Sequence, residues 1–229
     1  MTNFKNSRLL VIAPHADDEI LGCGGLISKI KSEGGKAFVL IFNVGSVSEI
    51  DNQKATTKWK KETEKAMKFL KVDNYETIFD SPKDNRFLDS KPLHDIIRII
   101  ETESKVSIDK IKPNIVAIPT NHSHHQDHIQ VFNAAIAALR PMRTPMPKIV
   151  LSYEAPEHSR WSSNGSFEPN FFLDIKSFLD KKIKAFYMYK SQVRPGHRDN
   201  NTIKAQAEYR GKEVGVKFSE SYHIHRWLE

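Results

Sequence analysis

The chain has 229 residues, enough for one α/β domain with a sizeable core, and no change in composition along it argues for two. Its 39% hydrophobic and 28% charged residues are typical of a soluble globular protein, and its longest apolar runs are far too short to cross a bilayer. Residues 1–8 lack the apolar core of a signal peptide, and a single cysteine, Cys23, excludes an internal disulfide, so we expect a cytoplasmic protein.

The formal net charge is +7, from 35 Lys and Arg against 28 Asp and Glu residues. Such an excess is compatible with nucleic-acid binding or with an anionic small substrate. The lysines between residues 54 and 71, however, alternate with Glu62 and Glu64 on a helix-like stretch, which favours a solvated helix face. Because no basic stretch is interleaved with aromatic residues as a stacking platform, we expect no nucleic-acid partner.

Short apolar runs predict strands, and they are nearly uninterrupted, as expected for strands covered on both faces. In chain order they cover residues 8–13, 37–42, 76–79, 114–119, 148–153 and 171–175. Apolar residues at helical spacing predict helices between them, over residues 20–30, 66–70, 93–100, 129–139 and 176–190. Two polar segments with prolines, residues 140–148 and 154–169, predict surface loops, and the second is long enough to cover a site.

This alternation predicts the α/β class, with a mainly parallel, doubly wound sheet between two layers of helices and a single domain over residues 1–229. In open sheets of this kind, ligands bind outside the carboxyl ends of the strands. Two polar segments directly follow predicted strands, Pro-His-Ala-Asp-Asp-Glu at residues 14–19 and His-Gln-Asp-His at residues 125–128. The sequence therefore predicts a site at this edge, assembled from both segments.

Metal-binding residue types dominate the two segments. His15, Asp18 and His128 together offer two imidazole nitrogens and one carboxylate with a fourth position open, which is the ligand count of a hydrolytic zinc site. Without cysteine ligands the site also suits iron(II) or cobalt. Asp17 would face the metal-bound water as general base. A charged His125 would stabilise the oxyanion formed at an amide carbonyl, with Asp127 holding its ring through Nδ1.

Simpler interpretations compete with this one. Asp17 and Asp18 could cap the following helix, since carboxylates favour a helix N-terminus. His122 and His124 are better explained as loop residues, and Cys23 as a small buried filler. Glycines at 22, 24 and 25 suggest a dinucleotide fingerprint, but three acidic residues in the same turn would repel a pyrophosphate. We expect these glycines to let the first helix pack closely on the sheet.

The two segments resemble the motifs of the PIG-L/LmbE superfamily of metal-dependent N-deacetylases. The resemblance continues through residues 22–25, 152–154, 169–170, 191–192, 210–211 and Glu220, so it covers nearly the whole chain. It implies a Rossmann-like fold that hydrolyses the acetamide of an N-acetylglucosamine-type sugar or conjugate. It also implies zinc on His15, Asp18 and His128, with Asp17 as general base, His125 as electrostatic stabiliser and Asp127 as its orienting partner.

This chain departs from the pattern where many relatives grip the substrate. They carry an arginine three residues before the glutamate aligned with Glu62, and here that slot holds Trp59. Arginine forks suit phosphate or carboxylate, and an aromatic ring suits a sugar face. The candidate substrate-binding residues are Trp59, Trp161, Arg194, His197 and Arg198, and the last four are at least as well explained as ordinary surface-loop residues.

The sequence thus predicts a zinc-dependent N-deacetylase whose partner is a small N-acetylated amino sugar or its conjugate. Relatives in the superfamily often form homo-oligomers, so a homo-oligomer is possible here. Two alternatives stay open. One is an amidase that removes another acyl group from an amino-sugar conjugate, and the other is a catalytically silent carbohydrate-binding protein.

Overall fold

The computed structural model describes residues 4–43, 53–81, 88–142, 144–154, 161–162 and 165–229. Within this part, seven strands form one sheet in the order β3-β2-β1-β4-β5-β7-β6. The strands are β1 (Arg8–His15), β2 (Lys36–Asn43), β3 (Asn74–Phe79), β4 (Ile115–Pro119), β5 (Ile149–Tyr153), β6 (Phe171–Asp174) and β7 (Ser219–Trp227). The six predicted strands are all present, and their order confirms the doubly wound α/β sheet.

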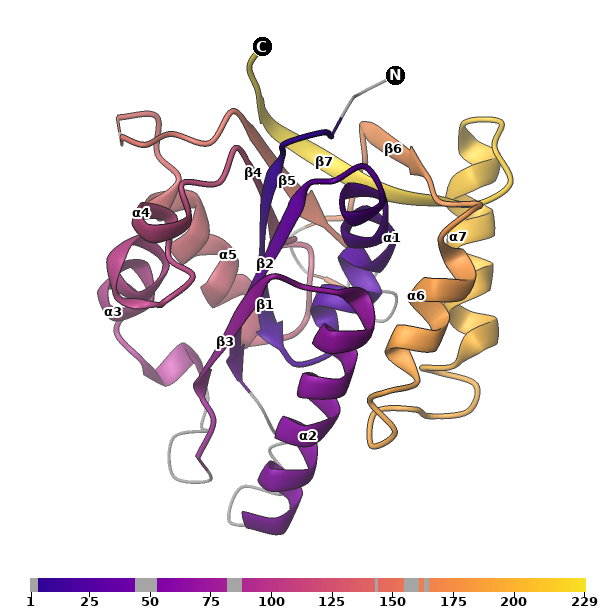
Figure 1. Ribbon diagram of the computed structural model, residues 1–229, viewed down its shortest axis with the longest axis horizontal. Coiled ribbons are helices and arrows are strands. Elements are labelled where there is room, and N and C mark those ends of the chain that lie inside the picture. The colour runs from indigo at the N-terminus through magenta and orange to yellow at the C-terminus, as the bar shows by residue number, and fades with distance from the viewer. Residues whose placement is uncertain (1–3, 44–52, 82–87, 143, 155–160, 163–164) are drawn as a thin grey trace.

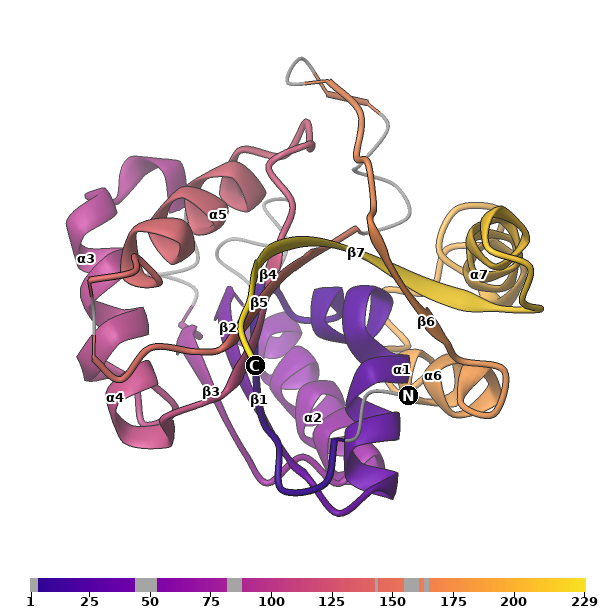
Figure 2. The same cartoon turned by 90° about the horizontal axis from the view of Figure 1, so that it is seen from above.

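Helices cover both faces of the sheet (Figures 1 and 2). One face carries α1 (Asp18–Ser32), α2 (Gln53–Leu70), α6 (Leu179–Phe186) and α7 (Asn200–Glu213). The other carries α3 (Leu93–Arg98), α4 (Ile108–Ile111) and α5 (Gln126–Ala138), together with a 3₁₀ turn at Leu88–Ser90 and a π-helical turn at Ile99–Glu103.

Strand β1 lies between β2 and β4, both parallel to it, and its residues show why the apolar runs are continuous. Leu9, Val11 and Ala13 belong to the core under α1 and α2. Leu10 and Ile12 point the other way, into the core under α3 and α5. Because successive side chains alternate between faces, a strand buried on both needs an apolar residue at every position.

The last third of the chain contains two elements that the apolar pattern does not predict, α7 and β7. Strand β7 runs antiparallel to both β5 and β6, joining the weakly patterned β6 to the sheet. The helix predicted at residues 176–190 is shorter in the structure, where α6 spans Leu179–Phe186. No helix among the described residues is long and apolar enough to span a membrane.

Helix α1 packs very closely on its neighbours, as the glycines suggested. A Cβ on Gly22 would lie 2.1 Å from the Tyr153 ring, and one on Gly25 would lie 2.5 Å from Ile175 Cγ2. Next to them, Cys23 is fully buried, and that burial raises its pKa well above the usual value, as expected of a packing residue. The close approach places the start of α1 firmly against the sheet.

A buried carboxylate locks α1 to the C-terminal elements. Glu220, on β7, accepts hydrogen bonds from the backbone amides of Gly25 and Leu26 at 2.7 Å each. It also accepts from Lys182 Nζ, on α6, at 2.7 Å, and this lysine donates further to the Leu21 carbonyl. Every partner of this buried charge is a donor, which is the condition for keeping it inside.

Candidate metal centre

The topology brings the two predicted segments together. Strands β1 and β4 are parallel neighbours, so their carboxyl ends lie at the same edge of the sheet. His15 ends β1, Asp17 directly precedes α1 and Asp18 is the first residue of that helix. After β4, His125 caps α5, and His128 lies in its first turn. His122 and His124 lie in the intervening loop, as expected.

The three predicted ligands converge. Asp18 Oδ2 lies 3.4 Å from His15 Nδ1 and 3.2 Å from His128 Nε2, and the donor atoms of all three residues lie within 4.8 Å of one another. Bonds of about 2.0–2.2 Å in a tetrahedral arrangement separate neighbouring donors by roughly 3.3–3.5 Å. The spacing around Asp18 therefore fits a cation of zinc's size between donors of the type that zinc binds.

Charges in this cluster are mutually stabilised. Burial by itself lowers the pKa of His15, but the hydrogen bonds that its ring donates to Asp127 and Asp18, with the charges of these carboxylates, outweigh burial and raise that pKa to about 10. Burial acts in the opposite sense on Asp18, yet His128 and His15 hold its pKa well below the usual value. The site is thus built to hold positive charge, and a bound cation would take the place of the ligand protons.

Asp127 contacts a different histidine from the one predicted. Its Oδ2 lies 2.8 Å from His15 Nε2, while its Oδ1 accepts the Leu88 amide at 2.9 Å. A carboxylate on the far nitrogen of a ligand histidine fixes the ring and its tautomer. Asp127 is therefore placed to orient His15, leaving Nδ1 directed at Asp18.

The predicted bond between the Asp127 carboxylate and His125 Nδ1 is replaced by another contact. His125 Nδ1 accepts the backbone N–H of Asp127 at 3.3 Å, which places the ring proton on Nε2. Burial, with the positive charges of His15 and His128, lowers the pKa of His125 to about 4. The expectation of a charged His125 is thus wrong for this structure, since the neutral ring dominates at pH 7 and donates through Nε2.

Asp17 occupies a strained backbone position, with φ 117° and ψ −27°. Its N–H donates to Glu19 Oε2 at 3.0 Å, and its carbonyl accepts from the amides of Ile20 and Leu21. Its side chain makes no capping hydrogen bond to α1, which contradicts the simple capping interpretation for this residue. Residues held in sparsely populated conformations often mark functional sites.

Glu19 supports Asp17 from below and was missed as a functional residue. It is fully buried, and Tyr189 donates a hydrogen bond to its Oε1 at 2.8 Å. Burial raises the pKa of Glu19 to about 8, although the hydrogen bonds from Tyr189 and the Asp17 amide act against this. The sequence signal was Glu19 itself, a third acidic residue directly after Asp17 and Asp18, which alone would supply the predicted base and the predicted carboxylate ligand.

Among the candidate substrate-binding residues, Arg198 is the one brought to the centre by a described contact. Its Nη1 donates to Asp17 Oδ2 at 2.9 Å. Arg194 and His197 are exposed in the same turn, which the paired backbones of Arg194 and Arg198 close at 2.9 and 2.8 Å. Trp161 is 80% exposed in its loop.

The prediction that the Trp59 ring contacts the substrate is wrong, because the ring is buried. The side chain is only 6% exposed and belongs to the core between α2 and the sheet, packed with residues such as Ala66 and Leu70. A ring buried in this way presents no face to a sugar. Trp59 is a packing residue of α2. It therefore does not replace the arginine that contacts the substrate in relatives.

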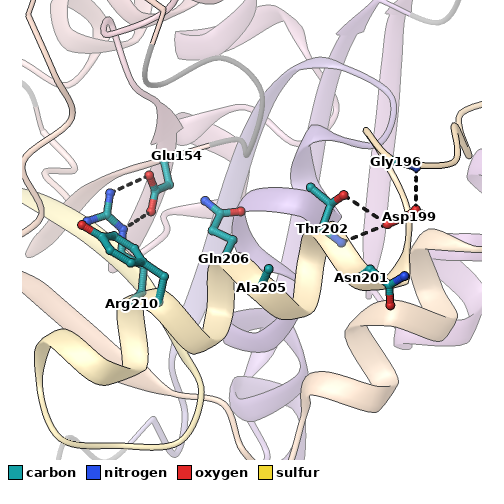
Figure 3. A pocket seen from close by; sticks show the side chains of 9 residues that line it. Glu154, Gly196, Asp199, Asn201, Thr202, Ala205, Gln206 and Arg210 are labelled. Atoms are coloured by element: carbon teal, nitrogen blue, oxygen red, sulfur yellow. Dashed lines mark hydrogen bonds and ion pairs between the residues drawn. The ribbon is translucent and has the colours of Figure 1, made fainter.

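A cavity of about 590 Å³, lined mostly by residues with polar groups, runs along α7 from the turn that carries Arg198 (Figure 3). At its near end Asp199 accepts from the Gly196 and Thr202 amides. At its far end Arg210 forms a two-pronged ion pair with Glu154, at 2.6 and 2.8 Å. These charged groups are satisfied by one another, so they stabilise the packing of α7 on the end of β5.

Comparisons with known proteins identify the family of this chain. Residues 10–139 match the PIG-L family, described as GlcNAc-PI de-N-acetylase. The chain is 30% identical over 193 residues to the uncharacterized deacetylase YaiS of Escherichia coli (strain K12), which covers 82% of this chain and 92% of that protein.

Two solved structures resemble the chain throughout. N,N'-diacetylchitobiose deacetylase from Pyrococcus horikoshii has a TM-score of 0.73 at 20% identity, covering 95% of this chain and 83% of its own. GalB, the 4-carboxy-2-hydroxymuconate hydratase of Pseudomonas putida KT2440, has a TM-score of 0.73 at 18% identity, covering 97% and 98%. Their different activities show that this likeness extends to the fold alone.

Proposed function

The chain belongs to the PIG-L family of de-N-acetylases, and from that premise we propose that it removes the N-acetyl group from an N-acetylglucosamine-type sugar or conjugate. The observation that carries the proposal is the spacing of His15 Nδ1, Asp18 Oδ2 and His128 Nε2, with the Asp17 turn directly beside them. Zinc is the first choice of cation for this donor set, and iron(II) or cobalt also suit it.

When bound, such a cation supplies Lewis acidity, which polarises an acyl oxygen and makes water a better nucleophile. Asp17 takes a proton from the water as its oxygen adds to the acetyl carbon. As the C–N bond breaks, Asp17 returns a proton to the sugar nitrogen, so acetate and the free amine leave. Its backbone, tied to Glu19 and to the start of α1, holds the carboxylate in place for both transfers.

His125 stabilises the developing oxyanion as a neutral donor. Its Nδ1 already accepts the Asp127 amide, so Nε2 carries the proton that a substrate oxygen can accept. A preorganised donor of this kind is typically worth about 3–4 kcal/mol in the transition state. Asp127 acts indirectly. Its Oδ2 lies 2.8 Å from Nε2 of the candidate ligand His15 and fixes the orientation of that ring.

The two alternatives predict different products. An amidase for another acyl group would release a longer acid, which mass spectrometry of the products distinguishes from acetate. A silent carbohydrate-binding protein would bind metal or sugar without any product. The arrangement of Asp17 and His125 around the candidate ligands argues against the silent protein, because binding alone needs neither.

The test is the Asp17→Asn variant, with zinc content and acetate release measured together on N-acetylglucosamine and its conjugates. We expect it to retain the metal and to lose turnover by about 100-fold or more, since a positioned base contributes that much. Asp180→Asn, an exposed change on α6, is the matched control. Full activity in Asp17→Asn would rule out its role as base, and no acetate from wild type on any acetylated sugar would refute the proposed substrate class.

A further inference from the structure

The carboxylate of Asp17 is held from the C-terminal third of the chain. Arg198 Nη1 donates to Asp17 Oδ2 at 2.9 Å across 181 positions of sequence. The two side chains are 15% and 2% exposed, so solvent and salt screen this ion pair much less than a surface pair. A hydrogen bond between two charged groups is also stronger than a neutral one. The contact can therefore determine how the carboxylate is turned.

Helix α1 does not orient this carboxylate itself. The backbone of Asp17 is fixed by its bonds to Glu19 and to the amides of Ile20 and Leu21, but these bonds leave the side-chain torsions of Asp17 open. The capping bond that would set these torsions is missing, because the carboxylate makes no capping hydrogen bond to α1. The orientation of the carboxylate therefore depends on contacts from outside the helix, and Arg198 supplies one of them.

Arg198 lies in a turn that is closed by its own hydrogen bonds. The Arg194 amide donates to the Arg198 carbonyl at 2.9 Å, and the Arg198 amide donates back to the Arg194 carbonyl at 2.8 Å. Asp199, the next residue, accepts from the Gly196 amide at 2.7 Å and from the Thr202 amide at 2.9 Å (Figure 3). One carboxylate thus closes the turn and caps α7, so the backbone of Arg198 is tied to a helix of 14 residues.

The segment that leads into this turn is anchored as well. The Ser191 amide donates to both carboxylate oxygens of Glu62, on α2, at 3.2 and 3.3 Å. Val193 packs against the core under α1 and α2. Because residues on both sides of the turn are held, the backbone of Arg198 is fixed relative to the sheet, and its guanidinium is delivered to the start of α1.

We propose that Arg198 is a positioning residue of the deacetylation. Its bond to Oδ2 holds the Asp17 carboxylate in the orientation in which Asp17 takes the proton from water and returns one to the sugar nitrogen. This rests on the proposed function, which makes Asp17 the base. It gives Arg198 a role different from the substrate contact expected from the sequence, because the guanidinium acts through another residue. An arginine that touched the substrate itself would strengthen binding instead.

The test is a double-mutant cycle on acetate release, with Arg198→Met, Asp17→Asn and the combined variant, all loaded with zinc. Methionine keeps most of the arginine stem and removes its donors. Arg198→Ala is measured in the same cycle, so that a packing defect of one variant does not decide the result. Lys204→Met, which removes a positive charge from an exposed position on α7, is the matched control and should leave turnover unchanged.

We expect Arg198→Met to lower kcat by about 10–100-fold at unchanged KM, because misplacing a catalytic group by about 1 Å can lower a rate by about 100-fold. In the Asp17→Asn background the same change should lower kcat by less than about twofold, since the base that Arg198 positions is already lost. Losses that multiply in the combined variant would overturn the proposal, because Arg198 would then act independently of Asp17. A raised KM at unchanged kcat would also overturn it and would assign Arg198 to substrate binding.

A second measurement needs no turnover and compares crystal structures of zinc-loaded wild type and Arg198→Met. We expect the Asp17 carboxylate to change its orientation or to adopt several in the variant, while His15, Asp18 and His128 stay in place. The same single orientation of Asp17 in both proteins would contradict the proposal. If wild type releases no acetate from any acetylated sugar, the proposed function fails, while this comparison still decides whether Arg198 orients Asp17.

Discussion

Replacing Asp127 by Asn isolates the carboxylate that orients the candidate ligand His15. Two N–H groups point at this side chain, His15 Nε2 at Oδ2 (2.8 Å) and the Leu88 amide at Oδ1 (2.9 Å). An asparagine has a single oxygen, so whichever way its amide is turned, its NH₂ group faces one of the two donors. The substitution keeps the shape and removes one acceptor.

The expected loss of metal affinity can be estimated from residues that hydrogen-bond to metal ligands in other proteins. Their loss typically lowers metal affinity by about 10–100-fold, which is about 1.4–2.7 kcal/mol. We expect a loss of this size for zinc in Asp127→Asn, measured by competition with a chelating dye. Acetate release at saturating zinc should recover part of the activity, because the ligands themselves are intact.

Asp89→Asn is the matched control, since Asp89 is exposed in the same 3₁₀ turn as Leu88. It should leave zinc affinity unchanged. A folded Asp127→Asn protein with wild-type zinc affinity would refute the reasoning that this carboxylate positions His15.

Three further outcomes test the packing and the metal. Gly25→Ala would place a methyl group 2.5 Å from Ile175 Cγ2 and 2.9 Å from the Glu220 carboxylate, so we expect a loss of about 1–3 kcal/mol in the free energy of unfolding measured with urea. Lys182→Met leaves Glu220 as a buried charge without its counterion and should cost about 3–5 kcal/mol by the same measurement, whereas exposed Lys184→Met should cost little. Zinc added at about 100 times its Kd should stabilise wild type by about 2.7 kcal/mol and chelation should reverse this; an unchanged Tm would count against a metal centre.

The centre of the fold was predictable because two independent signals coincide there. Continuous apolar runs marked the parallel strands, and the polar segments at residues 14–19 and 125–128 began where two of those runs ended. Parallel neighbours must bring such ends to one edge, so the meeting of His15, Asp18 and His128 required no knowledge of loop geometry.

The C-terminal elements gave weaker signals for physical reasons. Strand β7 has the sequence Ser-Glu-Ser-Tyr-His-Ile-His-Arg-Trp, in which single apolar residues are separated by polar ones, and only its first four residues are buried, so it lacks a continuous apolar run. Helix α7 buries only Ile203, Ala207, Arg210 and Gly211. Its other positions hold a mixture of polar, charged and apolar residues. Neither pattern separates an element from a polar loop.

Residue roles were less predictable than residue positions. The helical period of α2 places Trp59 on the same buried stripe as Ala66 and Leu70, and this period, not the slot of the family motif, predicts its position in the core. The partner of Asp127 could not be predicted, because a carboxylate at the second position of a helix can reach several neighbours. In the structure His15 approaches it from β1, 112 positions earlier in the chain.

The match to the PIG-L family ends at residue 139, yet three contacts that support the start of α1 come from residues beyond it. Tyr189 holds Glu19, Arg198 reaches Asp17, and Glu220 receives the amides of Gly25 and Leu26. The C-terminal third therefore supports the turn that carries Asp17. Exchanging this third between relatives to alter specificity would succeed only where the donor sequence preserves those three anchors.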